Sequence, residues 1–112
     1  MGSPRREFLY VDDLANAVVY LTSNYDEGDI VNIGSGEDIQ IRNLALLVAH
    51  AVGFDGQLRF DTSKPDGTPR KLLDVSRLHG LGWQPRWSLD DGIAATYEWF
   101  KNNEISKVQD SA

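Results

Sequence analysis

Apolar residues recur at helical spacing in two stretches of this chain. In the first stretch, Asp12-Asp13 precedes the apolar positions and supplies N-cap and first-turn carboxylates. In the second, which covers residues 42–52, Gly53 follows at the place of a left-handed C-cap. The apolar positions are Leu14, Ala17, Val18 and Leu21 in the first stretch, and Leu44, Leu47, Val48 and Ala51 in the second. The pattern therefore predicts two amphipathic helices.

Short runs of strand-forming residues lie beside these helices. The run that ends in Val11 is rich in aromatic and branched side chains, and a buried run follows Gly28 and is stopped by Gly34-Ser35-Gly36. The predicted strands and extended pieces are 7–11, 29–33, 39–41 and 58–60.

The second half of the chain is punctuated by turn residues. Residues 61–69 contain two prolines and a glycine, which predicts a long ordered loop. A short helix is expected near 75–79, broken by the glycines before Trp83. Ser88, with Asp91 three residues later, opens a final helix in the manner of a capping box, and that helix is predicted to run to about residue 102.

The order of these elements indicates a mixed fold of the α/β class. We expect a small α+β unit with short strands and about four helices, in one domain over residues 1–103, followed by a disordered tail over 104–112. The strands are too few and too short for a free-standing doubly wound sheet, so the unit resembles part of a larger protein.

Charge and composition exclude several classes of function. The net charge is −6, which repels a phosphate backbone on average, so we expect no nucleic-acid partner. No apolar run approaches the roughly 20 residues that cross a bilayer, so we expect no membrane partner. The absence of cysteine excludes disulfides and thiolate chemistry and fits a cytoplasmic location.

Two motifs that suggest catalysis are better explained by structure. Gly34 and Gly36 lack the third glycine of a dinucleotide-binding turn, since residue 39 is isoleucine, and we expect a plain turn. Tyr97 and Lys101 have the Tyr-x-x-x-Lys spacing of short-chain dehydrogenases, but they lie in an amphipathic helix without a cofactor site, and we expect packing. The sequence thus predicts no catalytic and no cofactor-binding residue.

The remaining titratable groups give no metal site. His50 and His79 lie on different predicted helices without further ligands at suitable spacing. The pair Asp12-Asp13 could serve as an acid and base, but its place at a helix N-terminus favours interaction with the helix dipole.

Basic residues are few in this acidic chain, yet they are grouped. They are Arg5-Arg6, and Lys64 with Arg70-Lys71 around the 61–69 loop. Arginine forks and lysine ammonium groups on a stiffened loop suit a diphosphate. A solvated loop with no ligand explains the same charges, so both interpretations stay open on the residues alone.

Several motifs resemble the GDP-L-fucose synthases. The most specific is Ser-Lys-Pro-Asp-Gly-Thr-Pro-Arg-Lys-Leu-Leu-Asp-Val-Ser-Arg-Leu over 63–78. The resemblance covers about residues 2–103, and its other segments are Arg-Arg-Glu-Phe-Leu-Tyr-Val-Asp-Asp-Leu-Ala over 5–15, Asn-Ile-Gly-Ser-Gly-Glu-Asp over 32–38, Leu-Gly-Trp over 81–83 and Tyr-x-Trp-Phe over 97–100. The segments 5–15 and 32–38 are shared more widely among extended short-chain dehydrogenases.

The resemblance implies the C-terminal, substrate-binding part of an NADPH-dependent enzyme, usually a homodimer. Such enzymes convert GDP-4-keto-6-deoxy-D-mannose to GDP-L-fucose by 3,5-epimerisation and 4-reduction. Arg6 and Lys71 match the family's substrate-contacting arginine and lysine, with Lys64 and Arg70 as further candidates. The Rossmann domain, with the NADP(H) site and the catalytic residues, belongs to a preceding region absent from this sequence.

Three interpretations follow from these motifs. The first is a GDP-sugar-binding part that is inactive alone, with no cofactor in this chain. The second is an interaction domain that associates with itself or with a separate Rossmann partner. The third is the same part of another nucleotide-sugar epimerase or dehydratase, against which the 63–78 segment argues.

Overall fold

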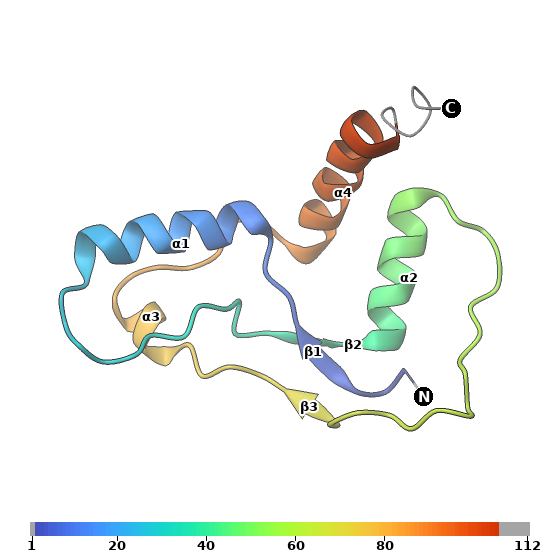
Figure 1. The fold of residues 1–112 in the computed structure, drawn as a ribbon, viewed down its shortest axis with the longest axis horizontal. Helices are drawn as coiled ribbons and strands as arrows, with labels where there is room; N and C mark the ends of the chain where they lie inside the picture. The colour runs from blue at the N-terminus through green and yellow to red at the C-terminus, as the bar shows by residue number, and fades with distance from the viewer. Residues whose placement is uncertain (1, 106–112) are drawn as a thin grey trace.

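The computed structural model describes residues 2–105, as four α-helices, one π-helix and a three-stranded sheet (Figure 1). This composition confirms the predicted small mixed fold. The helices are α1 (Val11–Asn24), α2 (Ile41–Val52), α3 (Ser76–Gly80), α4 (Leu89–Phe100) and the π-helix η1 (Lys101–Ile105); the strands are β1 (Arg5–Glu7), β2 (Asp38–Gln40) and β3 (Arg70–Lys71).

The sheet has the order β2-β1-β3, so the first strand lies in the middle. Strand β1 runs antiparallel to β2, where Arg6 is opposite Ile39. It runs parallel to β3, where Arg6 is opposite Lys71. Residues that follow one another in a strand point to opposite faces of the sheet. One face therefore carries Arg6, Ile39 and Lys71, and the other carries Arg5, Glu7, Asp38, Gln40 and Arg70.

The predicted helices are confirmed with small shifts of their ends. Helix α2 ends at Val52, and Gly53 follows with φ 75°, which is the left-handed C-cap expected from the sequence. Helix α4 begins after Ser88, whose Oγ accepts a hydrogen bond of 3.1 Å from the backbone N–H of Asp91. This bond satisfies one of the free N–H groups of the first turn.

The start of α1 differs from the prediction. The helix begins at Val11, and its N-cap is Tyr10, which makes no side-chain capping bond. Asp13 is buried, with 2% of its surface exposed, and accepts hydrogen bonds from the backbone N–H groups of Arg86 (3.0 Å) and Trp87 (3.1 Å). The carboxylate therefore joins α1 to the segment that leads into α4, in addition to its place near the helix dipole.

Of the four predicted strands, one is confirmed, one has different bounds, and two are not formed among the described residues. The extended piece at 39–41 is confirmed as β2, although Ile41 already belongs to α2. The strand at 7–11 is wrong in its bounds, because β1 pairs only over 5–7, where β2 and β3 lie beside it.

The strands predicted at 29–33 and 58–60 are not formed. Among the described residues no strand lies beside either segment, and pairing defines a strand as much as propensity does. The alternation at 29–33 is still present, since Val31 and Ile33 pack against the core while Ile30 is 86% exposed. The loop predicted at 61–69 is confirmed as irregular structure.

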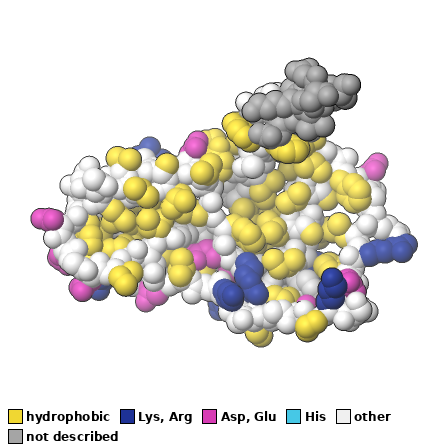
Figure 2. All heavy atoms as spheres, in the orientation of Figure 1, with side chains coloured by type: hydrophobic (Ala, Val, Ile, Leu, Met, Phe, Trp, Pro, Cys, Tyr) yellow, Lys and Arg dark blue, Asp and Glu magenta, His cyan; other side chains and the backbone are white. Residues whose placement is uncertain are grey.

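The core is small and lies between α1 and α3. Its buried side chains are Ala17, Leu78 and Trp83, with Leu9, Tyr20, Leu21, Val31 and Ile33 packed around them. The radius of gyration is 17.2 Å, whereas a compact domain of about 100 residues has roughly 13 Å. Hydrophobic side chains cover much of the face shown in Figure 2. The described residues thus form an open arrangement that buries few apolar groups.

The predicted tail begins at residue 104. Residues 104 and 105 continue the chain in η1, and residues 106–112 lie outside the described residues.

Candidate functional site

The two substrate-binding candidates lie side by side on one face of the sheet. Arg6 and Lys71 are register partners on the parallel strands β1 and β3, so their side chains start from neighbouring positions on the same face. Lys71 is exposed and Arg6 is half-buried. Within residues 2–105, Lys71 has no ion pair and no side-chain hydrogen bond. The face therefore presents one arginine and one unpaired ammonium group.

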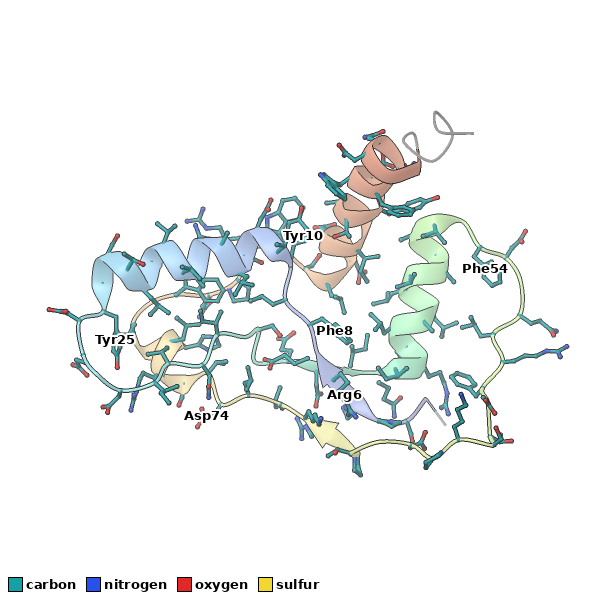
Figure 3. The ribbon with its side chains drawn as sticks, in the orientation of Figure 1. Arg6, Phe8, Tyr10, Tyr25, Phe54 and Asp74 are labelled. Carbon is teal, nitrogen blue, oxygen red and sulfur yellow. The ribbon has the colours of Figure 1, made fainter. Side chains whose placement is uncertain are left out.

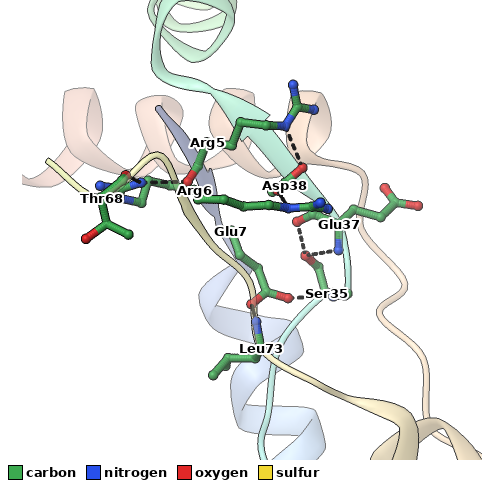
Figure 4. A network of polar contacts seen from close by, with 10 residues as sticks. Arg5, Arg6, Glu7, Ser35, Glu37, Asp38, Thr68 and Leu73 are labelled. Carbon is green, nitrogen blue, oxygen red and sulfur yellow. Dashed lines mark hydrogen bonds and ion pairs between the residues drawn. The ribbon is translucent and has the colours of Figure 1, made fainter. Parts of the chain in front are cut away.

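The Arg6 guanidinium also holds the loop that precedes β3. Its Nη1 donates to the carbonyl oxygens of Thr68 and Arg5, both at 2.7 Å (Figure 4). Gly67 allows this close approach, since a Cβ at that position would lie 3.2 Å from Nη2 of Arg6. A guanidinium carries five N–H donors, so Nε and Nη2 remain available for a ligand.

The opposite face of the sheet is occupied by an ion-paired network. Asp38 accepts from Nε of Arg5 at 2.9 Å through one oxygen and from Nε of Arg70 at 2.6 Å through the other. Its side chain is 5% exposed. The hydrogen bond from Arg5, followed by that from Arg70, lowers the pKa of the Asp38 carboxyl below its usual value, against the effect of burial.

Two further candidates do not join Arg6 and Lys71. Arg70 is the neighbour of Lys71 in sequence but points to the other face, where Asp38 binds it. Lys64 is exposed in the 61–69 loop and has no hydrogen bond or ion pair within the described part of the chain. The cations grouped in sequence are thus divided between two faces of the sheet and one loop.

Glu7 lies behind the candidate face and contacts two other segments of the chain, which the sequence does not predict. Its Oε2 accepts from the backbone N–H of Gly36 at 2.6 Å, and its Oε1 accepts from the backbone N–H of Leu73 at 3.2 Å. A Cβ on Gly34 would lie 2.7 Å from Oε2 of Glu7, so the glycine turn is shaped around this carboxylate. The glycines that suggest a nucleotide-binding turn therefore surround the carboxylate of Glu7. In the sequence, these glycines are the feature that could have drawn attention to Glu7.

A large apolar trough lies between α2 and α4. Its volume is about 1290 Å³, and it is lined chiefly by Phe8, Leu44, Val48, Ile93, Tyr97 and Phe100. Figure 3 shows Phe8 between β1 and α2, and Tyr10 near the start of α4. His79 also reaches the trough, and its Nε2 is buried without a hydrogen-bond partner among the described residues.

Tyr97 and Lys101 are neighbours on the last helical turns. The Lys101 ammonium lies over the Tyr97 ring, 4.8 Å from its centre, and forms an ion pair of 2.8 Å with Glu98. The hydrogen bond to Glu98 raises the pKa of Lys101. An ammonium over the ring face contacts the π-system of the tyrosine, which is the geometry of a cation–π pair.

Histidines and carboxylates do not converge on a metal site in the described part of the chain. No group of three or more His, Cys, Asp or Glu side chains within residues 2–105 could hold a metal ion, and His50 and His79 share no such group. None of the helices in this region is long and apolar enough to cross a membrane.

Comparison with known proteins finds related sequences. The NAD dependent epimerase/dehydratase family matches residues 1–34. A putative GDP-L-fucose synthase 2 of Arabidopsis thaliana is 56% identical over 96% of this chain and 33% of its own length.

Two solved structures share the fold. A GDP-L-fucose synthetase of Naegleria fowleri has a TM-score of 0.86 at 29% identity, over 91% of this chain and 32% of its own. A GDP-mannoheptose C4 reductase of Campylobacter jejuni with NADP bound has a TM-score of 0.78 at 44% identity, over 90% of this chain and 33% of its own.

These matches place the fold in one class of protein. The chain is similar in sequence and in fold to proteins of the extended short-chain dehydrogenase/reductase family. Within that family it matches GDP-L-fucose synthases, and it spans about a third of the length of the curated relatives it matches.

Proposed function

We propose that this chain is the C-terminal, GDP-sugar-binding part of a GDP-L-fucose synthase. The observation that carries the proposal is the pairing of Arg6 with Lys71 on one face of the sheet, in a chain whose net charge is −6. An anion that meets a net negative protein needs local cations, and this face supplies a fork-shaped donor beside a point charge. A diphosphate matches that combination.

The proposed role is binding and not turnover. In the parent reaction, hydride transfer requires the nicotinamide of NADP(H) to be held against the sugar. The Campylobacter relative has NADP bound, and we propose that the region beyond this chain provides the corresponding site in the parent enzyme. The isolated chain is expected to leave NADPH unoxidised when the keto-sugar is added.

Calorimetric titration with GDP and with guanosine tests the phosphate assignment. We expect GDP to bind and guanosine to bind at least about tenfold more weakly, because charge-assisted hydrogen bonds contribute about 1.5–3 kcal/mol each. Equal affinity for the two ligands would show that the cations of β1 and β3 do not contact phosphate. Raising the salt concentration should weaken GDP binding and leave guanosine unaffected.

A second role, as a docking domain, is favoured by the exposed apolar face of α1. Val11, Leu14 and Val18 are 63%, 43% and 50% exposed, and they lie at helical spacing on one side of the helix. Ile30 is 86% exposed. Because the relatives are three times longer than this chain, we propose that their remaining Rossmann region covers this face.

Mixing the chain with that remaining region of the Arabidopsis relative tests the docking role. Light scattering should show a one-to-one complex, and Val18→Glu should weaken it at least about tenfold because it places a charge in an apolar contact. Leu46→Glu on α2, where the side chain is 54% exposed, is the matched control. Self-association of the chain alone, or no complex, would contradict the proposal.

A further inference from the structure

Lys71 lies on a strand that has little to hold it. Strand β3 contains only two residues, both exposed, and it follows the irregular segment 53–69. Closing a long irregular segment costs conformational entropy, and a strand this short gains few ladder hydrogen bonds in return. The position of the Lys71 ammonium relative to Arg6 therefore depends on contacts made by neighbouring residues.

The first such contact comes from Asp38 on the far face of the sheet. Its two carboxylate oxygens bind Arg5 of β1 and Arg70 of β3 at 2.9 and 2.6 Å. The carboxylate thus bridges the two strands next to the position where Arg6 faces Lys71. Its side chain is 5% exposed, so water screens these ion pairs less than it screens surface pairs.

The second contact comes from Glu7 on the other side of Lys71 in sequence. Its carboxylate accepts from the backbone N–H of Leu73 and from that of Gly36. Figure 4 shows Glu7 and Asp38 in the same network, with Leu73 next to the Glu7 carboxylate. Lys71 is consequently bracketed, because Asp38 holds the residue before it and Glu7 holds the residue two positions after it.

We infer that Asp38 and Glu7 are positioning residues that fix Lys71 beside Arg6 and so preorganise the anion-binding face. Neither carboxylate faces the ligand, since both lie on the face of the sheet opposite Arg6 and Lys71. Their effect on an anion is indirect: they reduce the freedom that β3 would lose on binding. The predicted change in GDP affinity rests on the proposed GDP site. The clamp, by which we mean the contacts of Asp38 and Glu7 that hold β3 and the residues after it, does not depend on that proposal.

Asp38→Ala tests this inference through two measurements on the whole chain. Amide hydrogen exchange of peptides covering 67–73 should become about tenfold faster, because β3 opens more often. GDP affinity should fall about fivefold, the effect of one lost hydrogen-bonded contact. Asp38→Asn keeps the shape of the side chain and one acceptor oxygen, so it should give smaller changes in the same direction. This variant replaces Asp38→Ala in both measurements if the alanine variant does not fold.

Glu37→Gln is the matched control, since Glu37 is exposed and its side chain has no hydrogen bond or ion pair within the described residues. It removes the same charge one position away and should change neither exchange nor affinity. In the Lys71→Ala background, Asp38→Ala should change GDP affinity less than twofold, because two residues that act through one contact are not additive. A purely structural role would lower affinity equally in both backgrounds.

The outcomes separate this inference from the proposed function. Unchanged exchange at 67–73 in both Asp38 variants overturns the clamp. Faster exchange with unchanged GDP affinity, in a chain whose affinity Lys71→Ala does lower, overturns the positioning role. Absence of GDP binding by the unmodified chain refutes the proposed function instead, and the exchange measurement still decides the clamp.

Discussion

Trp83→Ala is expected to remove most of the free energy of unfolding of the chain. Trp83 is 3% exposed and is one of the few apolar side chains that are buried among residues 2–105. Its Nε1 donates to Oδ1 of Asn16 at 2.8 Å, so the ring is both packed and hydrogen-bonded. Truncating a buried tryptophan costs about 3–5 kcal/mol, while a whole domain has roughly 5–15 kcal/mol of stability. A core as small as this one lies near the lower end.

Urea unfolding followed by circular dichroism checks this result, because it does not depend on tryptophan fluorescence. Trp99→Ala removes the same side chain from α4, where it is 58% exposed. That control should change the free energy of unfolding by about 0.5 kcal/mol or less. Similar stability of the two variants would show that the α1–α3 core does not hold the fold together.

The helices could be predicted from the sequence because their signals are local. The apolar spacing of 42–52, Gly53 after it, and Ser88 with Asp91 at the start of α4 each depend on residues within a few positions. The structure confirms all three signals. Such features depend on residues within one or two helical turns and not on distant parts of the chain.

The strands and the buried carboxylates could not be predicted in the same way. A strand needs a partner, and 29–33 has apolar alternation without any strand beside it in the described region. Asp13 binds backbone groups 73 and 74 residues away, and Glu7 binds Leu73 across 66 residues. No local pattern reports such contacts, and the sequence favours for Asp13 an interaction with the helix dipole.

The arrangement of the basic residues could be predicted only in part. Their grouping along the chain is visible in the sequence, but the grouping alone does not distinguish Arg70 from Lys71. Side-chain direction alternates along a strand, so the register of β3 against β1 decides which of them shares a face with Arg6. In that register the Asp38 carboxylate, from another part of the sequence, joins Arg5 of β1 to Arg70 of β3.

The second large effect is expected for the Arg6→Ala, Lys71→Ala double variant. Each side chain is expected to contribute roughly 1 kcal/mol to binding of a diphosphate, which is below the range of about 1.5–3 kcal/mol for charged hydrogen bonds because both groups are partly solvated. Together they correspond to about a thirtyfold loss of GDP affinity. Arg6→Ala also breaks the hydrogen bond to the Thr68 carbonyl oxygen, so its effect combines lost phosphate contact with a change in the loop. The single Lys71→Ala variant therefore isolates the loss of a phosphate contact.

Arg59→Ala is the matched control for lost positive charge. Arg59 is exposed on the segment before the 61–69 loop and has no ion pair or hydrogen bond within residues 2–105. Its removal should change GDP affinity less than twofold, the small effect of a distant charge in water. Circular dichroism of the double variant should match that of the unmodified chain.

Calorimetric titration of GDP into the unmodified chain, the double variant and the Arg59→Ala control is the most direct test of the β1–β3 face as the nucleotide site. The arrangement of Arg6 and Lys71 as register partners predicts measurable binding that falls about thirtyfold in the double variant and persists in the control. Equal GDP affinity in all three proteins would contradict the assignment of these two residues to phosphate.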